Sequence, residues 1–133
     1  MIRPPRPLAS DIPEQGRTIM PIVIMATLDV DPALRAQFLT DADPLIQEAL
    51  AEDGCVEYSW GADHKNAARV NVFEEWRDEA ALRAHFAAPA YSTMVGLLQK
   101  AGMTAAEARK YRVDLIEPVY DPQGQARADF FTA

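Results

Sequence analysis

Two segments with alternating side chains, separated by a short polar connector, constrain the fold of this chain most strongly. Residues 55–62 and residues 69–76 each turn every second side chain to the same face, as β-strands do. Residues 63–68 between them are polar and have the length of a hairpin connection. The sequence therefore predicts two strands that follow one another directly and share an apolar face.

Strand and helix patterns precede this hairpin. Residues 22–28 form a short, almost continuous apolar run rich in β-branched side chains, which indicates a buried strand. Apolar residues then recur at spacings of three and four over 31–53, which predicts a helix with one apolar stripe. Gly54 follows and can supply the left-handed residue that ends a helix.

Two helical segments and a last strand follow the hairpin. We expect a helix over 78–87 with Asp78 as its N-cap, and a second one that Pro89 starts and Gly102 ends. Thr104-Ala105-Ala106-Glu107 matches a capping box, which predicts a short helical turn. The last strand is expected over 111–115, where apolar and charged residues alternate.

This order of elements, β-α-β-β-α-(α)-β, predicts an α+β fold of the ferredoxin-like, split βαβ type. In that fold an antiparallel sheet carries its helices on one face. The other face stays bare, and its side chains are expected to be Cys55, Glu57, Ser59, Asn71, Phe73 and Glu75. Their half-polar character permits a self-complementary interface with two-fold symmetry, and hence a homodimer.

Composition excludes several kinds of partner. The chain has 133 residues and a net charge of −7, so it is one domain by length and lacks the positive surface that a nucleic acid needs. Its one cysteine cannot form an intramolecular disulfide. No apolar run approaches the roughly 20 residues that span a bilayer, and the N-terminal residues lack the apolar core of a secretory signal. We therefore expect a cytoplasmic protein with no nucleic-acid or membrane partner.

We divide the chain into an extended, proline-rich arm over 1–19, a ferredoxin-like domain over 20–118 and a polar tail over 119–133. The arm is either a native segment that lies over a partner subunit or an addition in front of a natural start at Met20, and both alternatives stay open. Near its end the tail has two adjacent phenylalanines, Phe130 and Phe131. Paired exposed aromatics tend to mark contacts, so this end is a candidate contact with a partner.

Three residues near the end of the second hairpin strand are candidates for chemistry. His85 falls at the edge of a helical apolar stripe, where an imidazole could act as a general base; a histidine that only forms structural hydrogen bonds is the alternative. Glu74 lies among apolar neighbours, where burial would raise its pKa, and it is either a base or a structural partner of an arginine or of His85. Trp76 is either a pocket wall or core packing.

Further residues could line a substrate pocket between sheet and helices. Tyr58 and Trp60 share a strand face with each other and, if helices cover that face, would line the same cavity as Trp76; ordinary core packing is the alternative. Tyr91 and Met94 lie on the apolar stripe of the helical segment that follows Pro89, and we add them to the pocket. The two histidines have no recognisable metal-ligand spacing, so no metal site is expected.

Two short motifs carry a resemblance to a known family. They are Gly54-Cys55-x-x-Tyr58 and Glu74-x-Trp76-x-x-x-x-Ala81-Leu82-x-x-His85. With them, about residues 20–118 resemble the antibiotic biosynthesis monooxygenase (ABM) domains of the dimeric α/β-barrel superfamily. The resemblance implies a dimer that pairs sheet to sheet. It also implies cofactor-independent oxidation of a small aromatic or quinol-like metabolite by O2, with His85 as the base.

The chain departs from the family pattern in ways that limit this reading. Many relatives have a second histidine directly after the proline that corresponds to Pro89, where this chain has Ala90-Tyr91. The haem-degrading branch has a tryptophan at the position of His85 and an asparagine on the first strand, which lacks one here, so haem degradation is disfavoured. Two other functions stay open: a non-catalytic ligand-binding or stress-associated dimeric domain, and a proton-transfer isomerase of a small carbonyl metabolite.

Overall fold

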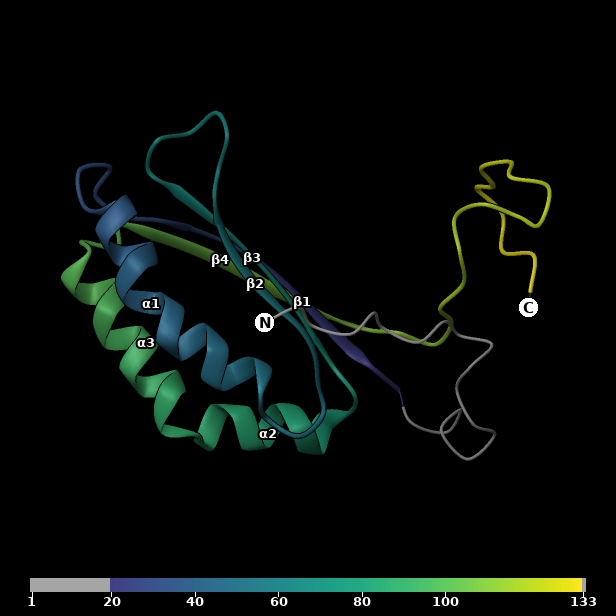
Figure 1. The fold of residues 1–133 in the computed structure, drawn as a ribbon, viewed down its shortest axis with the longest axis horizontal. Helices are drawn as coiled ribbons and strands as arrows, with labels where there is room; N and C mark the ends of the chain where they lie inside the picture. The colour runs from purple at the N-terminus through teal and green to yellow at the C-terminus, as the bar shows by residue number, and fades with distance from the viewer. Residues whose placement is uncertain (1–19, 133) are drawn as a thin grey trace.

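A four-stranded antiparallel sheet carries three helices on one of its faces (Figure 1). This computed structural model describes residues 20–132, so the arm predicted over 1–19 lies outside the described residues. The elements are β1 Ile22–Asp29, α1 Arg35–Leu50, β2 Cys55–Ala62, β3 Arg69–Trp76, α2 Glu79–Ala87, α3 Pro89–Lys100 and β4 Ala105–Arg112. The strand order is β2-β3-β1-β4, and the predicted ferredoxin-like α+β fold is confirmed.

The predicted hairpin is present, with one irregularity at its start. Tyr58 pairs with Glu74, and the face that they share is covered by helices, as expected. A β-bulge between Cys55 and Glu57 adds one residue to β2, so Cys55 pairs with Trp76. Because one extra residue reverses which face a side chain takes, Cys55 packs against the core and not on the bare face, and that prediction was wrong.

The last strand begins earlier than the sequence suggested. Residues 105–107 belong to β4 and form no helical turn, and β4 ends at Arg112, so 113–115 lie beyond it. The cause is β1, which pairs with β4 over its whole length, from Asp29 opposite Ala105 to Ile22 opposite Arg112. Thr104 also donates its backbone N–H to the carbonyl of Asp29 at 2.9 Å instead of capping a helix. The hydrogen bonds that β4 forms with β1 stabilise residues 105–107 as a strand more than the local capping signal favours a helix.

The core lies between the sheet and the helices in two clusters. One cluster joins α1 and α3 to the middle of the sheet through Phe38, Val70 and Met94. The second joins α2 to the ends of β1 and β3 through Trp76 and Leu82. The apolar stripe predicted for the first helix is confirmed in α1, although α1 begins at Arg35, after a turn, and not at residue 31.

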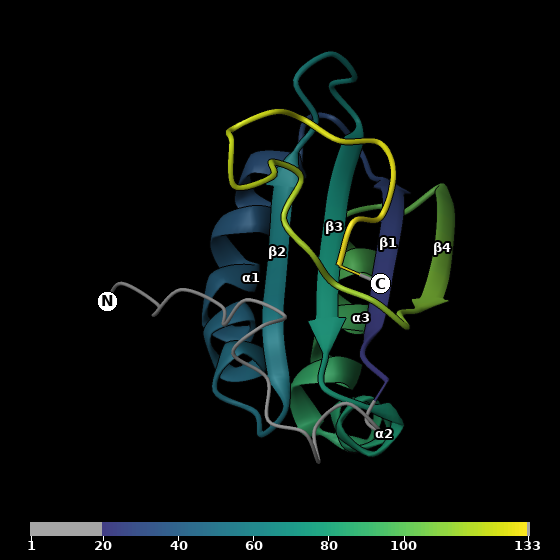
Figure 2. The same cartoon turned by 90° about the vertical axis from the view of Figure 1, so that its right-hand side faces the viewer.

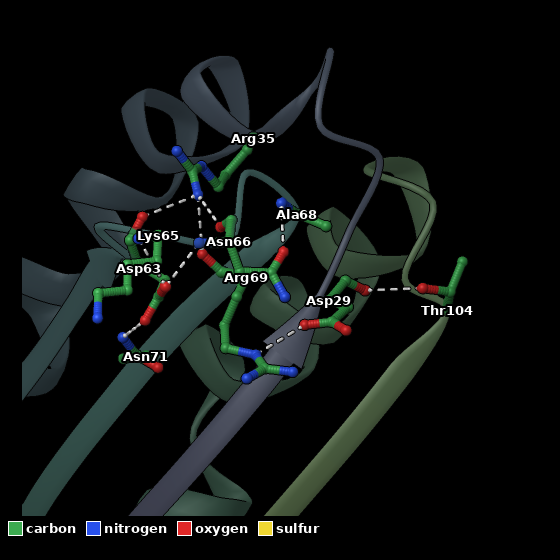
Figure 3. Close-up of polar contacts among 9 residues, drawn as sticks. All are labelled: Asp29, Arg35, Asp63, Lys65, Asn66, Ala68, Arg69, Asn71 and Thr104. Atoms are coloured by element: carbon green, nitrogen blue, oxygen red, sulfur yellow. Dashed lines mark hydrogen bonds and ion pairs between the residues drawn. The ribbon is translucent and has the colours of Figure 1, made fainter.

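The β2–β3 connector is tied to the start of α1 by one side chain (Figure 3). Arg35 Nη1 donates to the carbonyl oxygens of Asn66 at 2.8 Å, Arg69 at 3.1 Å and Asp63 at 3.4 Å. Asp63 accepts hydrogen bonds from Asn71 and from two backbone N–H groups of the connector, and these hold its pKa down at about 2. The hairpin therefore has a fixed position relative to α1.

The helices leave β4 and the other face of the sheet uncovered. In Figure 2, α1 and α3 lie behind β2, β3 and β1, and β4 forms the free edge beside β1. All eight residues of β4 are exposed. We call the face away from the helices the open face; Met25, Phe73 and Tyr111 lie on it, around a hollow of about 510 Å³.

Candidate functional site

His85 is held over the end of β3 by a helix with a defined start. Asp78 caps α2 by accepting a hydrogen bond from the backbone N–H of Ala81 at 2.9 Å. The side of α2 that faces the sheet then brings in Leu82 and His85, which is 2% exposed. The ring centroids of His85 and Trp76 are 4.4 Å apart with 33° between their planes, so the imidazole lies against the indole.

Aromatic rings surround the His85 imidazole on its other sides. Tyr58 lies 5.4 Å away and Tyr91 5.7 Å away between ring centroids, both edge-on. Phe86, which the sequence reasoning missed, lies at 5.9 Å and contacts Tyr91 at 5.1 Å. Phe86 and Tyr91 are both partly exposed, so these two rings form the outer wall between His85 and solvent.

The partner of His85 is Glu52, a residue that the sequence reasoning did not consider. His85 Nδ1 lies 3.1 Å from both carboxylate oxygens of Glu52. A carboxylate at this distance requires a proton on Nδ1, so Nε2 of a neutral imidazole is the nitrogen with the free lone pair. Nε2 has no hydrogen-bond partner within residues 20–132. It is not fully buried either, because Trp60 Nε1 is the only fully buried side-chain nitrogen or oxygen of these residues that lacks a partner. The arrangement therefore leaves a basic nitrogen available.

The turn that carries Glu52 is fixed to the end of β3. Gly54 has φ +83°, and a Cβ placed there would collide with Cβ of Ala81 in α2. Its carbonyl accepts a hydrogen bond from the backbone N–H of Arg77 at 2.8 Å. The Arg77 guanidinium also binds both carboxylate oxygens of Asp53, which lowers the Asp53 pKa. The sequence signal for Glu52 is that an acidic residue stands two positions before the Gly54-Cys55 motif.

Glu74 lies beside the same group of rings but forms no hydrogen bond with His85. It is 8% exposed, and its Oε1 accepts a hydrogen bond from Trp76 Nε1 at 2.9 Å. Burial raises the pKa of Glu74, and the hydrogen bond from the indole and the nearby His85 offset this only in part. Within residues 20–132 no hydrogen bond joins Glu74 to His85. Burial, with Glu74 nearby, also raises the pKa of Tyr58, which keeps that phenol protonated.

The structure brings five of the seven predicted site residues together and sets two apart. His85, Trp76, Tyr58, Tyr91 and Glu74 surround one point at the junction of β3, α2 and α3. Trp60 contacts Tyr58 at 6.2 Å, but it also packs against Phe38 in the other core cluster. Met94 lies wholly in that cluster, with Phe38 and Val70. Substrate contacts by Trp60 and Met94 stay predictions.

The hollow of the open face is on the opposite side of the sheet from His85. Its lining includes Met25, Phe73 and Tyr111, none of which contacts the imidazole. Around His85 itself, aromatic rings fill the space in which the sequence had placed a pocket. Phe86 and Tyr91 are the two rings of this group that lie at the surface.

Within residues 20–132, no group of three histidine, cysteine or acidic side chains could hold a metal ion. No helix in the same part of the chain is long and apolar enough to cross a membrane.

The chain folds as a small ferredoxin-like α+β domain in which the half-buried Glu52 binds the buried His85. The sequence profile of the family described as "Antibiotic biosynthesis monooxygenase" matches residues 21–97. That match covers more than half of the chain, and the chain belongs to this family.

Two further proteins and one solved structure are similar to this chain. "Uncharacterized protein sll1783" from Synechocystis is 29% identical over 93 residues, which cover 70% of this chain and 63% of that protein. "Putative monooxygenase YcnE" from Bacillus subtilis is 34% identical over 64 residues, which cover 48% of this chain and 67% of that protein. A conserved protein of known structure from Methanosarcina mazei has a TM-score of 0.66 and 26% identity, over 74% of this chain and 98% of that one.

Proposed function

We propose that this protein is a cofactor-independent monooxygenase that oxidises a small aromatic or quinol-like metabolite with O2. One observation supports this proposal above the others: Glu52 binds Nδ1 of the buried His85 and leaves Nε2 as a base. The family assignment and the name of the Bacillus subtilis relative support the proposed reaction class.

The proposed reaction begins with a proton transfer. His85 Nε2 removes the proton of a phenolic hydroxyl, and Glu52 stabilises the imidazolium that results. The phenolate transfers one electron to O2, and the phenoxyl radical and superoxide then combine into a peroxide on the ring carbon. The distal oxygen takes back the proton that His85 holds, which gives a hydroperoxide on the ring carbon. That carbon then loses its own hydrogen as a proton while the O–O bond breaks, so the departing hydroxide and this proton leave as water and a quinone remains. One oxygen atom enters the substrate and the other leaves as water.

The surrounding side chains position the substrate ring in this proposal. Trp76 and Tyr58 are the walls against which an aromatic ring would stack. Glu74 orients the substrate as a hydrogen-bonding carboxyl group, since burial raises its pKa and keeps it protonated over a wider range of pH. Tyr91 and Phe86 exclude water once the substrate is bound, which protects a reduced oxygen species from reacting with solvent.

We also propose that the protein is a cytoplasmic homodimer formed through the open face. Met25 and Tyr111 are exposed there beside the partly buried Phe73, and together they give that face an apolar patch around the hollow. An apolar patch on a bare sheet face marks a contact surface, and a two-fold axis would bury the same patch on both copies. Phe73→Glu is expected to give monomers in analytical ultracentrifugation, whereas Leu34→Glu, on the helix side, should not.

Oxygen uptake with a panel of hydroquinones and phenols tests the proposed activity. The wild-type protein should consume O2 with at least one member of the panel, and His85→Ala should abolish the consumption. Rates for His85→Ala that match the wild type would remove His85 from the mechanism. Conversion of a substrate that continues after O2 is removed would favour the isomerase over the monooxygenase.

The rings packed around His85 favour a second candidate, a ligand-binding domain without turnover. Tyr58 and Trp76 are almost fully buried, as packed core residues are. Quenching of the tryptophan fluorescence by a phenolic ligand, with no oxygen uptake and no product, would support this candidate over the enzyme.

A further inference from the structure

The chain continues past the sheet into an ordered segment that the family assignment does not explain. The family profile ends at residue 97, and β4 ends at Arg112. We call residues 117–132 the C-terminal arm. Figure 1 shows this arm standing clear of the sheet on the side away from the helices, and Figure 2 shows it crossing in front of the open face.

One buried carboxylate organises the middle of the C-terminal arm. Asp121 Oδ1 accepts hydrogen bonds from the backbone N–H groups of Gln123 at 3.0 Å and Gln125 at 2.9 Å. Its other oxygen pairs with Arg127 at 3.3 Å, and the Asp121 side chain is only 5% exposed. Tyr120 and Ala126 form a β-bridge across this turn. The arm therefore holds its own shape.

A second carboxylate closes the arm on itself. Glu117 accepts hydrogen bonds from the backbone N–H groups of Phe131 and Thr132 and from the Thr132 hydroxyl. The Arg127 guanidinium lies 5.2 Å above the Phe131 ring. Among the described residues, the hydrogen bonds of 117–132 all stay within the arm; the last bond from this end of the chain to the domain is from Val113 N–H to the Pro21 carbonyl.

This ordered arm presents apolar side chains to solvent. Val119, Tyr120 and Phe130 are 62%, 63% and 66% exposed, more than any other large apolar side chain of residues 20–132. An internally bonded segment with its apolar side chains turned outward has little reason to be ordered unless those side chains contact something. Because its shape is already set, docking would cost the arm little conformational entropy.

The free edge of the sheet has the complementary character. All residues of β4 are exposed, and the helices lie behind the other three strands and not behind β4 (Figure 2). It carries Arg109, Lys110 and Arg112 against the single acid Glu107. The arm has the opposite balance, since three carboxylates, at Glu117, Asp121 and Asp129, stand against one guanidinium. The outer edge of β4 also leaves a row of backbone N–H and C=O groups free to pair with another chain.

We propose that the C-terminal arm of one copy of this chain docks on strand β4 of a second copy. This inference rests on the proposed dimer, because a second copy on the open face lies on the side to which the arm projects. Tyr120 and Phe130 provide the apolar contact with Tyr111 of the other copy, and the acidic arm meets Arg109, which lies on the open face opposite Met25.

Paramagnetic broadening between two kinds of chain tests the contact directly. Isotope-labelled wild-type chains are mixed with unlabelled Cys55→Ala/Ala128→Cys chains that carry a nitroxide at residue 128, an exposed position of the arm that the proposed contact does not use. Amide signals of residues 105–112 in the wild-type chains should broaden. The same label on Leu34→Cys, on the helix side of the molecule, should leave them sharp. A mixed dimer whose β4 signals stay sharp with the arm label overturns the proposal.

The dimer dissociation constant separates failure of the arm from failure of the dimer. Tyr120→Ser/Phe130→Ser should raise that constant by about tenfold or more, which corresponds to at least about 1.4 kcal/mol of binding free energy, while Leu34→Ser leaves it unchanged. An unchanged constant for the double variant overturns the arm contact and leaves the open-face dimer in place. A wild-type protein that is monomeric at every concentration overturns both, while oxygen uptake still reports on the proposed activity independently.

Discussion

Glu52 holds the Nδ1 side of His85 with both carboxylate oxygens, each at 3.1 Å, across 33 positions of sequence. The two residues come from different elements, the turn after α1 and the helix α2. The turn is tied to β3 through Arg77, and α2 is fixed by its Asp78 cap, so the pair does not depend on two flexible side chains finding one another. Fixed geometry of this kind allows a carboxylate to orient a base.

Replacing Glu52 by glutamine should lower the rate of the proposed oxidation. Glutamine keeps the shape of the side chain but removes the charge that stabilises the imidazolium, so we expect kcat to fall by about 10- to 100-fold with little change in KM. Glu52→Asp should recover part of the loss. Glu48→Gln, an exposed change on α1, is the control. Equal kcat values for Glu52→Gln and the wild type would contradict an orienting role for Glu52.

The sequence predicted the elements better than it predicted their contacts. Alternation identified β2 and β3, and the three-and-four spacing identified α1, because both patterns report burial on one face. Cys55 was assigned to the wrong face because a bulge cannot be seen in alternation. The start of β4 was missed because alanines and a capping box favour a helix locally, whereas pairing with β1 is a long-range effect.

Local periodicity made part of the candidate site predictable, and a long-range contact that periodicity does not report left the prediction incomplete. His85, Trp76 and Glu74 fall within one hairpin strand and the next helix, so local periodicity places them on one side of the sheet. Glu52 joins them only through the fold, because the Gly54 turn packs on α2. A carboxylate at a turn has no periodicity that would single it out.

Gly54→Ala should destabilise the protein and disturb the site together. A non-glycine residue at φ +83° is strained, and its Cβ would collide with Ala81, so we expect a loss of about 2–4 kcal/mol in the free energy of unfolding. Gly96→Ala is the matched control: it lies in α3 with open space around it and should stabilise the protein by about 0.5–1 kcal/mol. Urea denaturation measures both, and a neutral Gly54→Ala would show that the turn has room to move.

Removing the guanidinium of Arg35 should loosen the β2–β3 connector. Arg35→Met keeps most of the aliphatic stem but loses the hydrogen bonds to the carbonyls of Asn66 and Arg69, and we expect a loss of about 1–2 kcal/mol. Hydrogen exchange of the connector amides should speed up. Arg83→Met, an exposed change on α2, should alter neither quantity. Unchanged exchange in Arg35→Met would mean that the Asp63 hydrogen bonds alone order the connector.

The buried carboxyl of Glu74 should make stability fall as the pH rises. Burial raises its pKa in the folded state above the ordinary value of 4.5, so the folded protein holds this proton at pH values where the unfolded chain has lost it. The stabilisation is complete at pH values below the unfolded-state pKa and is lost as the pH rises through the folded-state pKa.

Glu74→Gln removes this titration while its side-chain oxygen still accepts the hydrogen bond from Trp76. The melting temperature of Glu74→Gln relative to the wild type should therefore increase from acidic to neutral pH, by a few degrees. Glu48→Gln should show no such trend, and a constant difference between Glu74→Gln and the wild type across the pH series would mean that Glu74 titrates alike in the folded and unfolded chains.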